Sequence, residues 1–317
     1  MPQYLKNILR ITLAVGLTLS IWRVVAAPHN GFDLSGSTIP VNLIMYGGPD
    51  KDGIPALDKP KFVKSREVDF LKPEDRILGI EIEGVARAYP ISILNWHEIV
   101  NDQIRNQAFA VTYCPLCGTG VAFSATVDAQ ELDFGVSGLL YNSDVLLYDR
   151  QTESLWSQIK SEAISGDMVG HKLRKLPLMH TTWSDWQAQH PDSEVLSNDT
   201  GYSRDYSRDP YAGYADSRTT YFQVTHKAPP NYHPKERVLG VEVNGKFKAY
   251  PFSELEQSKQ SVITDHFAGK TLNIHWNAKH RSARITDVSG TIIPAIEGFW
   301  FAWFTFHPET AVYESST

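Results

Sequence analysis

Two stretches of this sequence, 161 residues apart, are close copies of each other. Residues 76–94 (RILGIEIEGVARAYPISIL) and 237–255 (RVLGVEVNGKFKAYPFSEL) are identical at ten of nineteen positions, and three further positions exchange isoleucine for valine. Agreement of that extent between distant segments indicates an internal duplication. The chain is therefore expected to fold as two related units.

Both copies have the pattern of a β-hairpin followed by a helix. Apolar residues alternate with polar ones up to a Glu-Gly pair at 83–84 or an Asn-Gly pair at 244–245, which are hairpin turn signals, and the chain then returns to Tyr-Pro. Because proline is favoured in the first turn of a helix, a short helix is expected after Pro90 and after Pro251.

Further strands are expected after each helix. Residues 109–113 and 272–276 match as strands, and residues 120–127 and 132–140 alternate in the same way. Residues 299–306 are almost all apolar and are predicted to form a buried strand. The predicted fold class is mainly β (α+β), with two related β-rich units, each with a hairpin and a short helix, packed as a sandwich or barrel.

A segment of different composition separates the two units. Residues 197–214 are dense in turn-forming residues and tyrosines, and they are too aromatic for a disordered linker. We therefore expect residues 167–234 to form a long, ordered, loop-rich connection. It would join a first unit at 27–166 to a second, degenerate unit at 235–317.

The first 26 residues have the features of a secretory signal peptide. Lys6 and Arg10 precede an apolar core at 11–21, and small residues end at Ala26. Cleavage there predicts a periplasmic or secreted protein with no stable transmembrane segment. An uncleaved N-terminal membrane anchor is the less favoured alternative, because this core is short for a span of roughly 20 residues.

The expected mature chain is acidic. Cleavage after Ala26 removes three basic residues and no acidic ones, which leaves 27 basic against 36 acidic residues and a net charge of −9. An acidic chain without a basic run argues against nucleic acid as a partner. The sequence identifies no partner, and the expected location allows an extracytoplasmic protein as one.

The two cysteines of the chain lie together in a Cys-Pro-Leu-Cys-Gly sequence at 114–118. A redox pair of the thioredoxin type opens a helix, whereas the residues after Cys117 are rich in glycine and then alternate like a strand. A tight turn of this kind between strands resembles half of a rubredoxin or zinc-ribbon site, in which the glycine takes a positive φ. The flanking residues therefore favour metal binding over a redox pair or a structural disulfide.

The second copy points to a third ligand. Asn277 and His280 stand opposite Cys114 and Cys117, and the counterpart of His97 is missing as well. A metal site built from His97 and the two cysteines would leave this pattern after one copy had lost it. Two thiolates and an imidazole suit copper or zinc, and copper is favoured because a single half-site is a weak structural zinc site.

Other polar residues near the cysteines are weaker candidates. Asp144 and Arg150 flank a predicted strand pair, where they would line a pocket or form a turn with a salt bridge. The sequence contains no phosphate-binding loop, no Gly-x-Ser-x-Gly and no His-Glu-x-x-His, so no catalytic residue is assigned. The candidate pocket residues are Glu98, Asp144, Tyr148 and Arg150.

Several runs of the sequence resemble a family of bacterial and archaeal proteins called "domain of unknown function 3179". The resemblance covers most of the expected mature chain and implies that both units belong to one family unit, but it implies no reaction. The runs that carry it are LNWHEIVND at 94–102, VTYCPLCG at 111–118, FGVSGLLYNSD at 134–144, YDRQTESLWS at 148–157, HPD at 190–192 and DTG at 199–201.

Three functions follow from the sequence. The leading one is an extracytoplasmic metal-binding protein with Cys114, Cys117 and His97 as ligands, acting in copper handling or electron transfer. The second is an enzyme, either a thiol–disulfide oxidoreductase at the same cysteines or a hydrolase that uses the region of Asp144. The third is a non-catalytic binding or structural protein with a disulfide between the cysteines.

Overall fold

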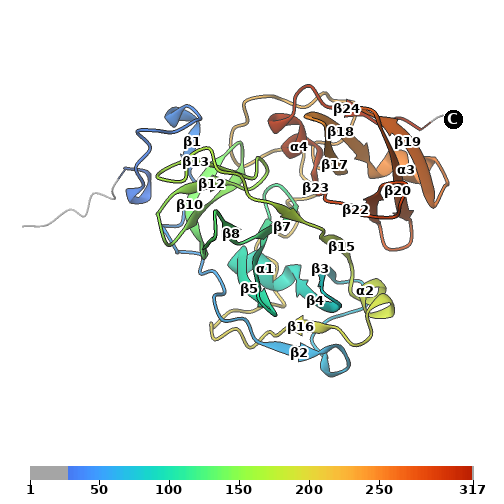
Figure 1. Cartoon of the computed structure of the whole chain (residues 1–317), viewed down its shortest axis with the longest axis horizontal. Helices are drawn as coiled ribbons and strands as arrows, with labels where there is room; N and C mark the ends of the chain where they lie inside the picture. Colours follow the sequence, from blue (N-terminus) through green and yellow to red (C-terminus); the bar gives the residue numbers. More distant parts are fainter. Residues whose placement is uncertain (1–27, 316–317) are drawn as a thin grey trace, which may run out of the picture.

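The hairpin-and-helix pattern of both copies is present in the computed structural model, which describes residues 28–315 (Figure 1). The predicted signal peptide at 1–26 lies outside the described residues. The helices predicted after Pro90 and Pro251 are confirmed, and each proline caps the helix that follows it. The matching elements are β3 (Arg76–Ile82), β4 (Val85–Pro90) and α1 (Ile91–His97) in one copy, and β17 (Arg237–Val243), β18 (Lys246–Pro251) and α3 (Phe252–Gln257) in the other.

A three-stranded meander follows the helix in each half. Both hairpins also have the same register, with Ile77 opposite Pro90 and Val238 opposite Pro251. The meanders consist of β5 (Ile99–Ile104), β6 (Gln107–Cys114) and β7 (Thr119–Ser124), and of β19 (Val262–Phe267), β20 (Lys270–Asn277) and β21 (Ser282–Thr286).

A second correspondence was not evident from the sequence. In each half a strand pairs antiparallel with the first hairpin strand, continues into a helix, and ends in a strand parallel to the second hairpin strand. These elements are β15 (Met179–Thr182), α2 (Trp183–Gln189) and β16 (Glu194–Leu196), and β23 (Ile296–Phe299), α4 (Trp300–Phe306) and β24 (Ala311–Val312).

The strand predicted at 299–306 is therefore wrong, because residues 300–306 form α4. Its side chains are apolar on every face, and most of them are buried, so the run has neither the alternation of a strand nor the stripe of a surface helix. Length and composition alone could not distinguish the two structures.

The strands form several open sheets, so the chain is mainly β without a closed barrel. The largest sheet runs β24-β18-β17-β23-β7-β6-β5 and joins the hairpin of the second half to the meander of the first through β23 and β7. The other hairpin forms the sheet β15-β3-β4-β16-β2, and the second meander forms β19-β20-β21-β22. The additional strands here are β2 (Phe62–Lys64), β14 (Lys175–Leu176), which pairs with β7, and β22 (Ile292–Ile293).

One five-stranded sheet has no counterpart in the second half. It runs β1-β10-β11-β12-β13, and its β10–β11 hairpin lies above the Cys-containing turn. These strands are β1 (Ile44–Tyr46), β10 (Phe134–Tyr141), β11 (Asp144–Asp149), β12 (Leu155–Ser157) and β13 (Glu162–Ser165). The remaining elements are the short pair β8 (Thr126–Val127) and β9 (Gln130–Glu131), and the 3-10 turns η1 (Pro28–Gly31), η2 (Val41–Leu43) and η3 (Ser65–Glu67).

The segment predicted as a loop-rich connection at 167–234 has two parts that differ. Its first part contains β14, β15, α2 and β16, whereas residues 197–234 form turns without a strand or helix. The domain boundaries themselves stay a prediction. None of the helices within residues 28–315 is long and apolar enough to cross a membrane.

A buried polar cluster lies where the two halves meet. Glu297 of β23 forms salt bridges with Arg237 (3.0 Å) and with Arg76 (3.5 Å), and it lies 3.1 Å from Nδ1 of His180 on β15, whose pKa burial lowers well below its usual value. Arg76 and Arg237 are the first residues of the two sequence copies, and His180 and Glu297 occupy the same register position beside their hairpins. The cluster is thus assembled from equivalent positions of the two halves.

Equivalent glycines allow a tryptophan to pack against each hairpin. A Cβ atom at Gly240 would lie 2.2 Å from the ring of Trp303, and one at Gly79 would lie 2.3 Å from the ring of Trp186. Both rings are buried, so neither can move aside freely. We expect Gly240→Ala to lower the free energy of unfolding by about 1–3 kcal/mol, as overpacking of a core does.

Urea denaturation followed by fluorescence measures this effect. Gly36→Ala is the control, because a Cβ atom there meets nothing within 4 Å. Equal stability of the two variants would contradict the close packing of Trp303 on β17.

Candidate metal centre

The two cysteines lie on a tight turn between antiparallel strands, as the sequence predicted. Cys114 ends β6, and β7 begins at Thr119, directly opposite it. Gly118 takes a φ of +62°, which an L side chain rarely adopts, and the ring of Phe299 lies 3.0 Å from the place of its absent Cβ. The backbone N–H of Phe299 donates to the carbonyl of Cys117 at 2.8 Å. The C-terminal half of the chain therefore helps to hold this turn.

A third acidic side chain reaches the cysteines from the β10–β11 hairpin. Asp144 begins β11 directly after a two-residue turn, Asn142-Ser143, in which both residues have positive φ. The two Sγ atoms and a carboxylate oxygen of Asp144 all lie within 4.8 Å of one another. Both thiols also contact the carbonyl oxygen of Ser143, at 3.7 Å from Cys114 and 3.2 Å from Cys117. The sequence named Asp144 for a pocket but not as a ligand.

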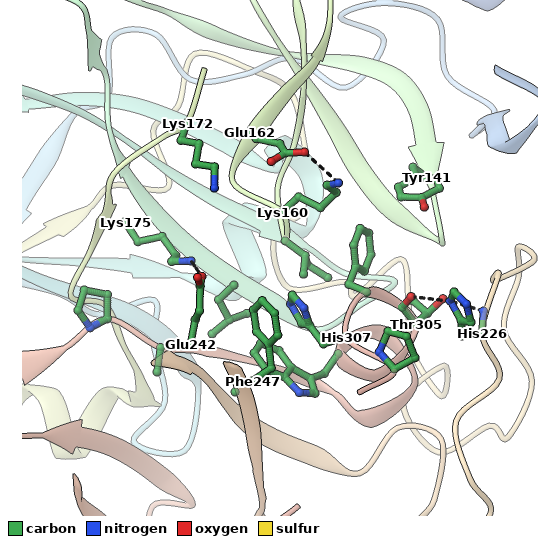
Figure 2. Close-up of a pocket in the computed structure, with 18 residues that line it drawn as sticks. Tyr141, Lys160, Glu162, Lys172, Lys175, His226, Glu242, Phe247, Thr305 and His307 are labelled. Atoms are coloured by element: carbon green, nitrogen blue, oxygen red, sulfur yellow. Dashed lines mark hydrogen bonds and ion pairs between the residues drawn. The ribbon is translucent and has the colours of Figure 1, made fainter. Parts of the chain in front are cut away.

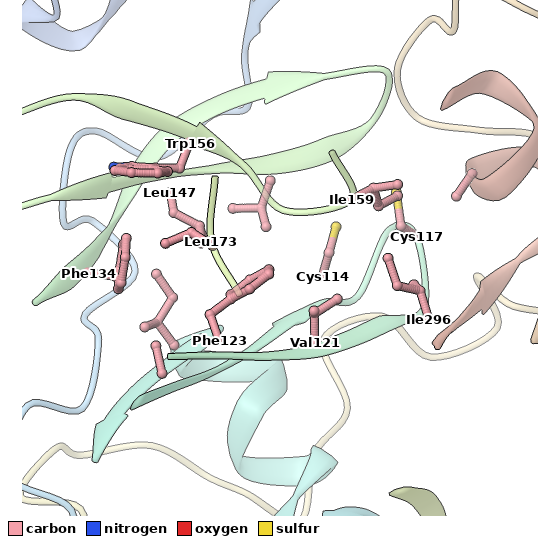
Figure 3. Packing of buried hydrophobic residues seen from close by; sticks show 14 of the residues in the cluster. Cys114, Cys117, Val121, Phe123, Phe134, Leu147, Trp156, Ile159, Leu173 and Ile296 are labelled. Atoms are coloured by element: carbon pink, nitrogen blue, oxygen red, sulfur yellow. The ribbon is translucent and has the colours of Figure 1, made fainter. Parts of the chain in front are cut away.

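All three side chains of this group are buried. Figure 3 shows Cys114 and Cys117 among apolar neighbours of the largest core cluster, with Ile159 and Ile296 beside them. The cysteines are free thiols in this structure, so the structural disulfide considered from the sequence is not formed. Thiolates and a carboxylate converging in an apolar surrounding are suited to a metal ion, whose charge would offset the cost of burying them.

The electrostatics of the group agree with this interpretation. Burial raises the pKa of Asp144 to about 8, although its Oδ2 accepts a hydrogen bond from the backbone N–H of Ile159 at 3.1 Å. Burial and then the neighbouring Cys114 raise the pKa of Cys117 well above its usual range. Within residues 28–315, no lysine, arginine or histidine forms a salt bridge with Asp144. Asp144 and Cys117 therefore favour their protonated forms unless a cation replaces the protons.

Glu98 is a second buried carboxyl near this group. It follows α1 with a φ of +58°, and its carbonyl accepts a hydrogen bond from the N–H of Tyr113 on β6. Burial, and then the charge of Asp144, raise the pKa of Glu98 to about 8. Glu98 is not part of the three-ligand group. A cation bound to that group would nevertheless favour the charged form of the Glu98 carboxyl.

His97, which the sequence predicted as the third ligand, lies outside this group. Its Nδ1 is hydrogen-bonded to the carbonyl of Pro55 at 2.8 Å, and its Nε2 is bonded to the hydroxyl of Tyr206 at 2.7 Å. Burial lowers the pKa of His97 and favours the neutral ring. Ligation by His97 stays a prediction, and it would require that one of these hydrogen bonds be broken.

The other two pocket candidates form a separate polar site. Tyr148 and Arg150 both bind Asp52, and Arg150 also lies 3.4 Å from Asp58. Tyr148 packs in an apolar cluster different from the one that holds the cysteines. Of the four candidates, the structure brings Asp144 to the cysteines directly and Glu98 close by.

The loop after β16 covers the group. Tyr214 is buried in the same cluster as the cysteines, and the ammonium group of Lys235 lies 3.8 Å from its ring centroid. The hydroxyl of Ser143 donates to the carbonyl of Phe222 at 3.0 Å, which fastens the loop beside Asp144. The density of tyrosines in the segment was the single sequence feature that could have indicated this role.

These observations define the class: a mainly β protein with a buried Cys/Cys/Asp group that could hold a metal ion. The chain belongs to the family described as "Protein of unknown function (DUF3179)", whose model matches residues 51–291. The family resemblance in the sequence is thereby confirmed. No curated protein and no solved structure matches this chain.

Proposed function

We propose that this protein binds one transition-metal ion through Cys114, Cys117 and Asp144, in the periplasm or outside the cell. The observation that carries the proposal is the convergence of three buried acidic side chains without a basic partner in a salt bridge among residues 28–315. Burying these groups in their charged, deprotonated forms is costly unless a cation is buried with them. A metal ion supplies that charge and uses the same donor atoms.

We propose zinc as the metal, in preference to copper. The preference for copper rested on the weakness of a single half-site as a zinc site, and the carboxylate of Asp144 now adds a third donor to the two thiols. Thiolates suit both metals, but a carboxylate oxygen is a harder ligand that zinc accepts readily and copper(I) does not. Glu98 is an additional buried carboxyl that feels the charge of Asp144 and could complete the coordination.

The burial of the site favours an ion that stays bound to the protein over one that is passed to another molecule. Cys114 is 1% exposed and Cys117 is fully buried, and the loop with Tyr214 lies over them. A thiol–disulfide oxidoreductase needs a cysteine that its substrate can reach, so this arrangement gives that alternative no support. We therefore propose that the ion stabilises the fold around the turn.

We also propose that the chain arose by duplication of one unit. The identical order of hairpin, helix and meander supports this origin, as do the shared hairpin registers and the strand–helix–strand segment of each half. In the second half, Asn277 and His280 stand where the cysteines would be, which agrees with loss of the metal site from that copy.

Metal analysis tests the proposed function. The protein is isolated from its native compartment and purified without chelator. We expect one zinc ion per chain, and we expect Asp144→Asn to lower the affinity for zinc at least about tenfold through loss of a ligand. Asp149→Asn is the matched control, since Asp149 is equally buried but binds Thr152 and Trp156. The two thiols should react with a thiol reagent only after the metal has been removed.

Three outcomes would contradict the proposal. One is a protein that takes up neither zinc nor copper when it is reconstituted under reducing conditions. Another is equal zinc binding by wild type and Asp144→Asn. The third is a native protein whose cysteines are joined in a disulfide. Stoichiometric copper in place of zinc would overturn the choice of metal and would leave the site itself supported.

A further inference from the structure

A cavity of about 330 Å³ lies beside the metal centre (Figure 2). It shares Ile159 and Ile296 with the apolar cluster around the cysteines, but it contains none of the proposed ligands. Its walls come from both halves of the chain, including the β12–β13 turn, β14, β17, β18 and the end of α4. Its charged and imidazole side chains are Lys160, Glu162, Lys172, Lys175, His226, Glu242 and His307.

One side of the cavity is flat and aromatic. The rings of Phe247 and His307 are stacked, with centroids 3.8 Å apart and planes inclined by 19°. The ring of Trp303 lies against His307 at 4.3 Å between centroids. A surface of this kind suits a planar or apolar ligand body better than a compact tetrahedral ion.

Three lysines lie on the opposite side, and they differ in how closely they are paired. Lys160 is paired closely with Glu162, at 2.9 Å. Lys175 forms a longer ion pair with Glu242, at 3.9 Å, which is beyond hydrogen-bond distance and which an anion could replace. Lys172 has no salt bridge within residues 28–315, and Figure 2 shows its ammonium group pointing into the same space as that of Lys175.

The lysines outnumber the carboxylates in the lining of the cavity, with Lys160, Lys172 and Lys175 against Glu162 and Glu242. Burial, and then the charges of Lys175 and Lys160, lower the pKa of His307 to about 3. Burial also lowers the pKa of Lys175. A partly desolvated ammonium group gains more from an anion than an exposed one does, because water screens it less.

We propose that this cavity binds a small organic anion, with its carboxylate between Lys172 and Lys175 and its flat apolar body against Phe247 and His307. This is a binding site separate from the metal centre. The proposal does not depend on the presence of a metal, because no residue is shared between the two sets of contacts.

Calorimetric titration of the full chain with benzoate tests this site. Benzoate carries a carboxylate on a planar ring, so we expect binding of one molecule with a Kd on the order of 0.1–1 mM, as its small size allows. Lys172→Ala/Lys175→Ala should weaken binding at least about tenfold, because two charge-assisted contacts are lost. The matched control is Lys246→Ala/Lys270→Ala, which removes the same charge from exposed hairpin turns.

Two further ligands separate charge from shape. Benzamide has the planar ring without the charge and should bind at least about tenfold more weakly than benzoate. Inorganic phosphate has the charge without the ring and should also bind more weakly.

The proposal fails if benzoate shows no saturable binding, if benzamide or phosphate binds as tightly, or if the cavity variant binds like the control. If the two lysine variants have equal urea midpoints, unfolding is excluded as the cause of weaker benzoate binding by the cavity variant.

Discussion

Removal of the metal is expected to destabilise the protein strongly. Without the ion, buried Asp144 and Cys117 regain protons, and the metal–ligand bonds that join the Cys-containing turn to the β10–β11 hairpin are lost. Structural zinc contributes apparent binding free energies of about 10–16 kcal/mol in small domains, and a chain with its own large core should lose a part of that, on the order of 5 kcal/mol. Urea denaturation with and without a strong chelator measures the loss.

A variant without ligands provides the control. Cys114→Ser/Cys117→Ser should be unstable from the start, and chelator should not change its urea midpoint. Zinc added back should restore the midpoint of the chelated wild type but not that of the variant. An unchanged wild-type midpoint after complete loss of metal would show that the ion does not stabilise the fold.

Replacement of Glu297 by alanine is expected to have the second large effect. Glu297 is 4% exposed and contacts Arg237 and Arg76, so its loss leaves two guanidinium groups without their shared carboxylate. Breaking a buried ion pair by removing one partner costs about 3–5 kcal/mol, because the remaining charge is still desolvated. We expect the free energy of unfolding to fall by that amount.

Glu256→Ala is the matched control for this experiment. Glu256 also pairs with an arginine, Arg281, at 2.9 Å, but both side chains are about half exposed. An exposed pair of this kind contributes about 0–1 kcal/mol. The difference between the two variants in urea denaturation isolates the effect of burial, and similar losses in both would contradict the importance of the cluster at Glu297.

The Cys-containing turn was predictable because its determinants are local. Strand alternation on both sides, two cysteines and a following glycine are enough to specify it, and the structure has the same features. The third ligand was not predictable in this way. Asp144 reaches the cysteines through the packing of the β10–β11 hairpin over the turn, which no local pattern encodes.

The case for His97 shows a limit of comparing the two copies. A residue that is present in one copy and absent from the other can be a ligand or a structural residue, and the sequence does not distinguish these roles. In the structure, both ring nitrogens of His97 connect chain segments through Pro55 and Tyr206. The same limit applies to the apolar run at 300–306, where burial of a helix on every face left no periodicity to detect.

The sheet that joins β23 to β7 has a consequence for the order of folding. Phe299, which holds the turn at Cys117, follows the cysteine far along the chain, and the covering Tyr214 also comes later. Contacts of such long sequence separation form slowly because loop closure must precede them. If the chain crosses a membrane from its N-terminus, as the proposed export requires, the cysteines emerge before their cover, and we expect the proposed ion to reach them fastest during that interval.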